Sequence, residues 1–385
     1  MSGGFALFDL VPELAAKVSR VALGELPTPV ESLEALSHEL GRSAARHRAE
    51  VGEAWVKRDD ISSPVYGGNK VRTLELLFGA ARARGASTIY STGAYGSNHA
   101  LACALHAPRV GLRAGALLFP QPVSHAAYLN LRALSETAAT LHAVPHWSVL
   151  PLGMALLRLG SAGTPPYLML PGGATPLGAL GYVSAGLELG RQIAAHALPL
   201  PRRVVVGVGS TCTSAGLLVG LALAAHFRLG FEPATLPQLV SVRVTPWPVT
   251  SRLRILGLAS RTARLLRQLG GSTLPSFDSA TLGARFQVDG RFLGSGYGAP
   301  SAAGEEAEAL WRRSGLPALD GTYSAKAAAR VIAGLRANEP GPTLFWSTKS
   351  SVPLPVAESD AREHAASAPP RIRAWLFRAE RTLRL

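Results

Sequence analysis

One lysine stands at a position suited to chemistry, directly after two glycines and an asparagine in "PVYGGNKVRTLELLFGAA", residues 64–81. The chain has five lysines against 34 arginines, so a lysine at this position raises the question whether its amine has a chemical role. An unprotonated lysine amine can form an imine with a carbonyl group, which an arginine guanidinium cannot do. The glycines leave the loop free to bring the amine of Lys70 into a cleft. A solvated lysine that opens a helix is the default for this motif alone, with catalysis as the alternative.

Two glycine-rich loops offer polar groups at the start of a helix. The first, "GVGSTCTSAG" (207–216), follows an apolar strand, and its backbone N–H groups could bind a phosphate. It lacks the Gly-Lys-Ser/Thr of a nucleotide-binding loop and the spacing of a dinucleotide fingerprint, so a capped tight turn is equally compatible with it. In the second, "STGAYGSNHA" (91–100), Ser97 and Asn98 could cap the helix or, with His99, donate to a carboxylate or a ring oxygen.

The elements that must position these loops alternate between short β-branched runs and longer helical segments. This alternation predicts an α/β protein with parallel sheets, in which ligands collect at the carboxyl ends of strands. The glycine- and proline-rich segment 157–182 is predicted to hold connections between units. The expected elements are strand–loop–helix at 86–107 and 202–227, strands at 113–122 and 238–248, and helices at 126–139 and 251–270.

The composition predicts a globular protein, because 47% of the residues are apolar and 17% are charged. No apolar run is long enough for a membrane span, and the N-terminal stretch has no basic start typical of a signal peptide. Cys103 and Cys212 fit a reducing cytoplasm and have no metal-ligand spacing. The net charge of +14 is spread along the chain without a nucleic-acid-binding module, so nucleic-acid binding remains only a minor alternative. The tail 369–385 predicts an amphipathic closing helix or a weak binder of anionic surfaces.

Taken together, these motifs resemble the pyridoxal-phosphate enzymes of the tryptophan synthase β fold. The resemblance favours the branch of 1-aminocyclopropane-1-carboxylate deaminase and D-cysteine desulfhydrase, and it spans roughly residues 26–350. The matching stretches appear in the order of the family: "LPTPVE", "VKRDDISSPVYGGNKVRTLE", "STGAYGSNHALA", "PGGATPLGALGYVSAGLEL", "GVGSTCTSAGLLVG", "GYGAP" and "LDGTYSAKA".

The resemblance implies a role for each matching position. Lys70 matches the lysine that holds the cofactor as a Schiff base, and Asn98 matches the residue that hydrogen-bonds its phenolic oxygen. The loop from Gly209 to Gly216 would bind the phosphate. The implied catalytic residues are Lys70, Tyr297, Tyr323 and Ser97; the implied cofactor-binding residues are Lys70, Asn98, Gly209, Ser210, Thr211, Cys212, Thr213 and Thr348; and the implied substrate-binding residues are Ser97, Asn98, His99, Tyr297 and Tyr323.

The resemblance also implies an architecture. A smaller domain, residues 69–189, would be inserted into a larger cofactor-binding domain formed by residues 1–68 and 190–385. The cofactor, pyridoxal 5′-phosphate, would lie in the cleft between them. Relatives of this type are usually homodimers, and the expected partner is a small amino-acid substrate.

The implied chemistry starts with a substrate amine that replaces Lys70 on the cofactor. The freed lysine then acts as general base at the α-carbon, while the cofactor ring takes up the charge. A leaving group on the β-carbon would give a keto acid and ammonia. Ser324 and Thr348 stand where cyclopropane-acid deaminases have a glutamate and an apolar residue. We therefore expect β-elimination, with D-cysteine as the first substrate, and keep cyclopropane-acid deamination as the alternative.

Two departures from the family pattern bear on the site. Lys349 and Ser350 in "WSTKSS" replace a glycine pair that follows the threonine in relatives, which changes the wall of the pocket. A catalytically impaired descendant that only binds the cofactor or an amino acid is therefore a further alternative. Cys212 stands in the phosphate loop where a smaller residue is usual, and it is either just small enough or redox-sensitive.

Overall fold

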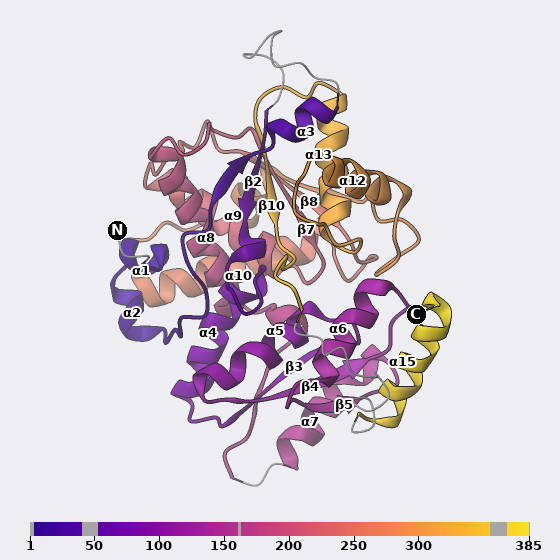
Figure 1. The fold of residues 1–385 in the computed structure, drawn as a ribbon. Helices are drawn as coiled ribbons and strands as arrows, with labels where there is room; N and C mark the ends of the chain where they lie inside the picture. The colour runs from indigo at the N-terminus through magenta and orange to yellow at the C-terminus, as the bar shows by residue number, and fades with distance from the viewer. Residues whose placement is uncertain (1–3, 41–52, 161–162, 355–367, 385) are drawn as a thin grey trace.

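The computed structural model describes residues 4–40, 53–160, 163–354 and 368–384. Two sheets organise the chain, the larger in the upper half of Figure 1 and the smaller in the lower half. The six-stranded sheet has the order β1-β2-β10-β7-β8-β9 and is parallel except for β1. Its strands are β1 (Val30–Ser32), β2 (Ala54–Arg58), β7 (Arg203–Val208), β8 (Gln238–Arg243), β9 (Phe286–Asp289) and β10 (Thr343–Ser347).

The smaller sheet is fully parallel, with the order β5-β4-β3-β6. Because parallel neighbours need crossover connections, helical segments follow β3, β4 and β5 and return the chain to this sheet, whereas the chain after β6 leads to β7 of the larger sheet. The strands are β3 (Thr88–Ala94), β4 (Arg113–Phe119), β5 (Thr140–Ala143) and β6 (Tyr167–Leu168).

Helices cover the sheets. The α-helices are α1 (Ala6–Leu10), α2 (Glu13–Lys17), α3 (Glu34–Glu39), α4 (Lys70–Ala83), α5 (Asn98–His106), α6 (His125–Ser135), α7 (Leu150–Leu159), α8 (Pro176–Ala194), α9 (Cys212–His226), α10 (Arg252–Gly270), α11 (Ser279–Gly283), α12 (Ala302–Arg313), α13 (Ser324–Arg336) and α15 (Pro370–Leu383). Short 3₁₀ turns lie at η1 (Asp59–Ile61), η2 (Ala107–Val110), η3 (Trp147–Val149) and η4 (Pro171–Gly173). None of the described helices is both long enough and apolar enough to cross a membrane.

The central strand β7 is buried on both faces. Val204 and Val206 join a core that includes α8, α9 and α10, whereas Val205 between them joins the core under α12 and α13. Alternation of side chains along a strand explains why this run of valines serves two cores. Figure 1 shows these two helical layers on opposite sides of the sheet.

The C-terminal helix α15 packs against α6 beside the smaller sheet (Figure 1). Its apolar face is buried through Ile372, Trp375 and Leu376. The Trp375 indole donates to the backbone carbonyl of Gln121 at 2.8 Å, and the Tyr128 hydroxyl donates to Glu380 at 3.0 Å. The prediction of an amphipathic closing helix is therefore confirmed.

The predicted α/β class is confirmed, and each predicted strand and helix is present. The strand–loop–helix units correspond to β3 with α5 and to β7 with α9. The segment 157–182 contains connections, as predicted, and also the end of α7, β6 and the start of α8. The proline at the first position of α8 is well placed for a helix start, and the Thr175 hydroxyl caps the N–H of Gly178. The domain boundaries expected from the resemblance stay a prediction.

Candidate active site

Lys70 is the first residue of α4, and the two glycines before it allow this helix to start against β10. Gly68 has φ +93°, a backbone conformation that favours glycine, and a Cβ there would lie 2.7 Å from the carbonyl oxygen of Thr348. The backbone N–H of Asn69 donates to the same carbonyl at 2.9 Å. The loop thus crosses the end of β10 closely and brings Lys70 to the carboxyl edge of the large sheet.

The Lys70 amine faces the glycine-rich loop after β7. Its Nζ donates to the Ser210 hydroxyl at 3.3 Å. Burial lowers the pKa of Lys70, so the amine loses its proton more readily than a solvated lysine. An unprotonated amine is the form that attacks a carbonyl carbon or accepts a proton from carbon.

His99 lies close enough to Lys70 for the two charges to interact. Burial, followed by the positive charge of Lys70, lowers the pKa of His99 to about 3, so its imidazole is neutral at physiological pH. Neither ring nitrogen has a hydrogen-bond partner among the described residues, although the side chain is buried. Buried polar atoms without partners are uncommon and indicate a missing ligand or water.

The loop after β7 presents a bare helix start. Thr211, the residue before α9, has φ +67°, and no side chain caps the first turn of this helix. The first N–H groups of α9 are therefore available to an anion, which the helix dipole also favours. Ser97, Ser124 and Ser251, in contrast, each cap their own helix with the side-chain oxygen.

Gly172 provides space beside this loop. A Cβ at Gly172 would lie 2.2 Å from Cβ of Ser210 and 3.5 Å from Nζ of Lys70, and its φ is +66°. Thr213 also faces the lysine loop, because its hydroxyl accepts a hydrogen bond from Asn69 Nδ2 at 2.9 Å. Loop 207–213, Gly172 and Lys70 therefore form one cluster.

In the predicted phosphate loop, Gly216 lies inside a helix and the Cys212 thiol is unreactive. Gly216 lies inside α9 and packs on α8, where a Cβ would be 2.4 Å from the Ala179 carbonyl, so its role is helix packing. The Cys212 thiol is buried and donates to the Gly173 carbonyl at 3.5 Å. Burial raises the pKa of Cys212, which keeps the thiol protonated and unreactive. The structure favours the interpretation that Cys212 is simply small enough for this position.

Asn98 is fixed in one orientation at the start of α5. Its Oδ1 accepts from Asn130 Nδ2 at 2.6 Å and from the Tyr66 hydroxyl at 3.1 Å. In the described parts of the chain its Nδ2 group has no acceptor, so it remains available as a donor to a ligand. The Ser97 hydroxyl accepts from the N–H of Ala100 at 3.2 Å and keeps its own hydrogen for another acceptor.

The two predicted tyrosines meet, although they come from different segments. The hydroxyl oxygens of Tyr297 and Tyr323 are 3.1 Å apart, and their rings pack edge to face. The Tyr323 ring also lies against Gly209, where a Cβ would be 3.4 Å from the hydroxyl oxygen. Burial raises the pKa of both phenols, so each keeps its proton at neutral pH and can donate it.

Ser324 and Thr348 are both buried at the carboxyl side of the large sheet. The Ser324 hydroxyl, at the start of α13, has no partner among the described residues. Thr348 follows β10, and its carbonyl anchors Asn69 as described above. No hydrogen bond from the Thr348 side chain to another predicted site residue is found in the described chain.

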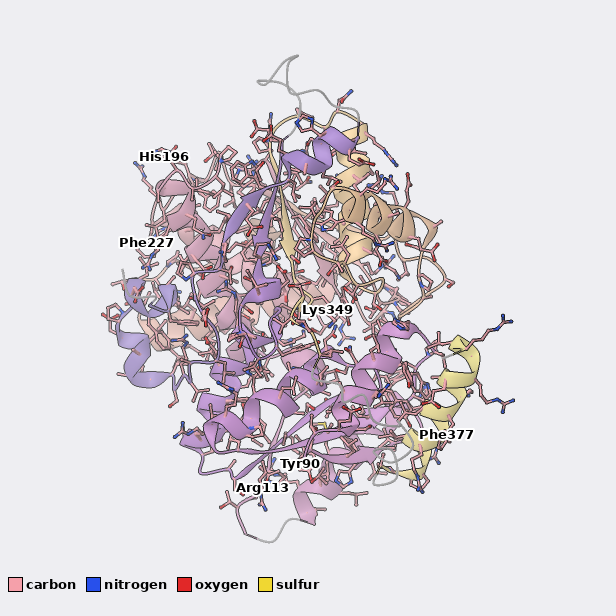
Figure 2. The ribbon with its side chains drawn as sticks, viewed as in Figure 1. Tyr90, Arg113, His196, Phe227, Lys349 and Phe377 are labelled. Atoms are coloured by element: carbon pink, nitrogen blue, oxygen red, sulfur yellow. The ribbon has the colours of Figure 1, made fainter. Side chains whose placement is uncertain are left out.

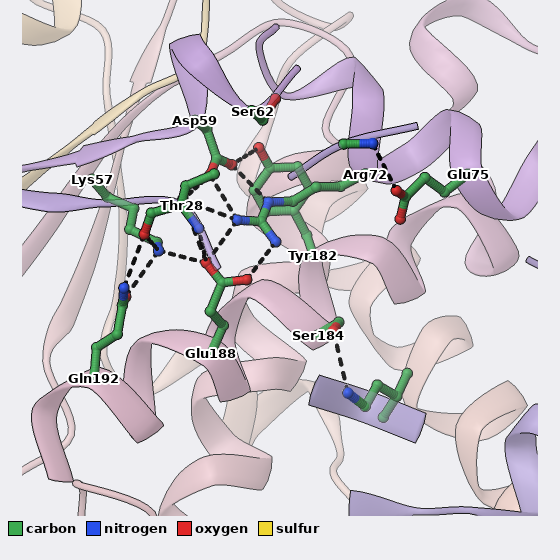
Figure 3. Close-up of polar contacts among 12 residues, drawn as sticks. Thr28, Lys57, Asp59, Ser62, Arg72, Glu75, Tyr182, Ser184, Glu188 and Gln192 are labelled. Carbon is green, nitrogen blue, oxygen red and sulfur yellow. Dashed lines mark hydrogen bonds and ion pairs between the residues drawn. The ribbon is translucent and has the colours of Figure 1, made fainter. Parts of the chain in front are cut away.

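A buried ionic network around Arg72, in the first turn of α4, was not predicted from the sequence (Figure 3). Arg72, two residues after Lys70, donates to both oxygens of Asp59 at 2.8 and 3.0 Å and to both oxygens of Glu188 at 2.9 Å. Lys57 also donates to Glu188, and the Tyr182 hydroxyl donates to Asp59 at 2.6 Å. The network joins β2, α4 and α8 and so fixes the helix that begins at Lys70.

The charges of this network balance, with two cations facing two carboxylates. Burial alone would raise the pKa of Asp59, but Arg72 and Lys57 outweigh it and hold this pKa at about 2. The pKa of Glu188 is likewise lowered, because the same two cations outweigh its burial. A sequence signal was present, since charged residues occupy core-facing positions of "AWVKR", "KVRTLE" and "SAGLELG".

The residues present fit pyridoxal phosphate. The uncapped start of α9 suits its phosphate, the Lys70 amine suits its aldehyde, and Asn98 Nδ2 offers a donor for its phenolic oxygen. The unpartnered Ser324 hydroxyl offers a hydrogen bond to a ring nitrogen. No cluster of three metal-ligating side chains occurs among the residues that the structure describes.

Comparisons with known proteins show the family to which this chain belongs. The model of the family described as "pyridoxal-phosphate dependent enzyme" matches residues 21–338. Nocardicin C-9′ epimerase of Nocardia uniformis subsp. tsuyamanensis is 36% identical over 301 residues, covering 77% of this chain and 86% of that protein. D-cysteine desulfhydrase of Salmonella choleraesuis is 33% identical over 339 residues, covering 86% of this chain and 93% of that protein.

A solved structure described as an ACC deaminase homologue superposes with a TM-score of 0.67 at 26% identity. The superposition covers 89% of this chain and 94% of the other. The extent of the family match and the identity to both relatives establish that this chain belongs to the family of pyridoxal-phosphate dependent enzymes.

Proposed function

We propose that this enzyme is a lyase that eliminates the β-substituent of a small amino acid, with D-cysteine as its first candidate substrate. The products would be a keto acid, ammonia and the leaving group. The observation that carries the proposal is Lys70, a half-buried amine of lowered pKa whose Nζ is 3.3 Å from Ser210 in the uncapped loop before α9. Its 33% identity to D-cysteine desulfhydrase supports this choice of substrate.

Different residues of the site would bind different parts of the cofactor. Gly209, Ser210, Thr211, Cys212 and Thr213 would bind the phosphate through the backbone of loop and helix. Asn98 would hold the phenolic oxygen, and Lys70 would hold the aldehyde carbon. When bound, the cofactor supplies an electron sink for the charge that develops at the substrate's α-carbon.

The chain itself supplies the proton transfers. Lys70 would take the proton from the α-carbon, because its lowered pKa favours the free amine. Ser97 and the neutral His99 would bind the substrate carboxylate by hydrogen bonds. Tyr297 and Tyr323, which keep their protons at neutral pH, would donate one toward the leaving group.

Ser324 and Thr348 support elimination over opening of a cyclopropane ring. A hydroxyl near the pyridine nitrogen protonates it less than a carboxylate would, which gives a weaker electron sink. A good leaving group such as a thiolate needs less assistance than a ring carbon. We further propose a cytoplasmic homodimer, an assignment supported by two unpaired, buried cysteines and by the resemblance.

Epimerisation at the α-carbon is a second candidate function. It is favoured by the 36% identity to nocardicin C-9′ epimerase and shares the first proton transfer with elimination. The paired phenols of Tyr297 and Tyr323, both protonated, offer a donor that could return a proton to the α-carbon. The two candidates differ in whether the β-substituent leaves.

The test begins with the visible absorption of the purified protein saturated with pyridoxal phosphate. We expect a band from the lysine-bound cofactor in the wild type, its loss in Lys70→Ala, and its retention in Lys17→Ala, a lysine on the exposed surface. Keto-acid release is then measured with D-cysteine, L-cysteine and 1-aminocyclopropane-1-carboxylate. Uptake of deuterium at the α-carbon without keto acid would favour epimerisation. A wild type without the band, or a Lys70→Ala variant with full turnover, would refute the proposal.

A further inference from the structure

Lys349 is the second lysine at this site, and its position follows from the end of β10. It stands two residues beyond that strand and pairs through its backbone with Gly68, two residues before Lys70. Figure 2 shows Lys349 near the middle of the molecule, between the regions of the two sheets. The side chain is partly buried. Nothing in the proposed elimination uses its ammonium group.

The ammonium is held by one aromatic side chain. Lys349 Nζ donates to the Tyr66 hydroxyl at 2.9 Å and lies 4.9 Å from the centre of the same ring. The Tyr66 hydroxyl in turn donates to Asn98 Oδ1 at 3.1 Å, and Asn98 adjoins Ser97. Lys349 is thus connected by two hydrogen bonds to the loop that would bind substrate.

This cation has no counter-ion among the described residues. None of the ion pairs there includes Lys349, whereas the buried Lys57 is paired with Glu188. The described side-chain partner of Lys349, the Tyr66 hydroxyl, is a polar group and not a carboxylate. A partly buried ammonium beside neutral donors attracts an anion.

We propose that Lys349 is a specificity-determining residue that binds a negatively charged β-substituent of the substrate. The substrate class would then be amino acids with an anionic group on the side chain, of which a departing thiolate is the smallest example. This inference rests on the proposed function, because it requires an amino acid bound at Lys70. A compact ammonium on a flexible stem suits a substituent that leaves during the reaction.

The test compares ligands that differ in charge but hardly in shape. Aspartate and asparagine, each as the D and the L form, carry no good leaving group and are titrated into the holoenzyme. Binding is measured by calorimetry and by the change in cofactor absorption. The proteins are the wild type, Lys349→Met, which keeps the stem, and Lys349→Arg, which keeps the charge.

We expect the wild type to prefer aspartate over asparagine by about tenfold or more, the size of a charge-assisted hydrogen bond. Lys349→Met should abolish this preference and leave asparagine binding within about threefold, and Lys349→Arg should retain most of it. Equal weakening of both ligands would show that Lys349 binds the α-carboxylate or only supports Tyr66, and would overturn the proposal. Equal binding of both ligands to the wild type would also overturn it, while leaving elimination intact. No binding of any of these amino acids to the wild type would overturn this role of Lys349, whereas the proposed function is decided separately by keto-acid release from D-cysteine.

Discussion

Replacing Arg72 by methionine should strongly destabilise the protein without touching a predicted catalytic residue. Arg72 makes five hydrogen bonds to Asp59, Glu188 and Thr28, all of them buried. Its removal leaves one lysine against two buried carboxylates. Breaking a buried ion pair by removing one partner typically costs about 3–5 kcal/mol, a large part of the roughly 5–15 kcal/mol that stabilises a domain. We expect a loss of about 3 kcal/mol or more for Arg72→Met.

Urea unfolding of the holoenzyme at saturating cofactor measures this loss, with the m-value checked for each variant. Arg113→Met is the matched control. The Arg113 side chain is exposed and, among the described residues, donates only to Ser87, so its loss should cost less than about 0.5 kcal/mol. The double variant Arg72→Met/Asp59→Asn restores the balance of charge, and its cost should fall short of the sum of the single costs by about 1–3 kcal/mol. A cost below about 1 kcal/mol for Arg72→Met, or strict additivity in the double variant, would refute the assigned role of the network.

Two further predictions concern the cofactor loop and acid stability. Gly172→Ala should weaken cofactor binding by about tenfold or more, because the added Cβ would lie 2.2 Å from Ser210. Gly111→Ala has a similar φ of +74° and no atom within 4 Å, so in a cofactor titration it should bind normally, and equal binding by both variants would contradict the steric argument. The pKa of Asp59 falls from 3.8 to about 2 on folding, and that of Glu188 also falls, so both stabilise the fold above about pH 4 and lose this contribution as the pH drops toward 2. For Asp59 the full contribution is about 2 kcal/mol, and about half of it should be lost between pH 5 and pH 3. Urea unfolding at the two pH values measures this loss, and an Asp59→Asn variant with the same acid dependence would contradict it.

The sequence indicated candidate site residues but not their arrangement. Lys70 stood out because its type, its glycines and the following helical pattern all agreed, and α4 begins at that residue. The contact between Tyr297 and Tyr323 could not be predicted in the same way. The two lie on segments 26 residues apart that meet only when β9, α12 and α13 have packed. Their glycine-rich contexts indicated loops, but not that the two side chains would be in contact.

The buried network shows a different limit of prediction. Each of its charged residues is ambiguous alone, since a charge in an apolar run can be an exposed residue on a solvated face. The partners are far apart in sequence; Arg72 and Glu188, for example, are separated by 116 positions. Only the folded chain brings strand β2 and helices α4 and α8 together and excludes water from them. Amphipathic helix α15 was predictable from its own pattern, but its position on α6 was not.

Lysine and arginine have different roles in the ion pairs and in the proposed site. Among the described residues, arginine supplies the basic partner of nearly every ion pair, and Lys57 is the only lysine in one. Lys17 and Lys326 donate to backbone carbonyls. The two remaining lysines, Lys70 and Lys349, lie at the proposed site. Arginine stays charged and binds carboxylates with two parallel hydrogen bonds, so it suits permanent ion pairs. A lysine can lose its proton, or bind, through a compact charge, a ligand that comes and goes. A chain that uses lysine this sparingly has placed two of its five where a scaffold would not need them.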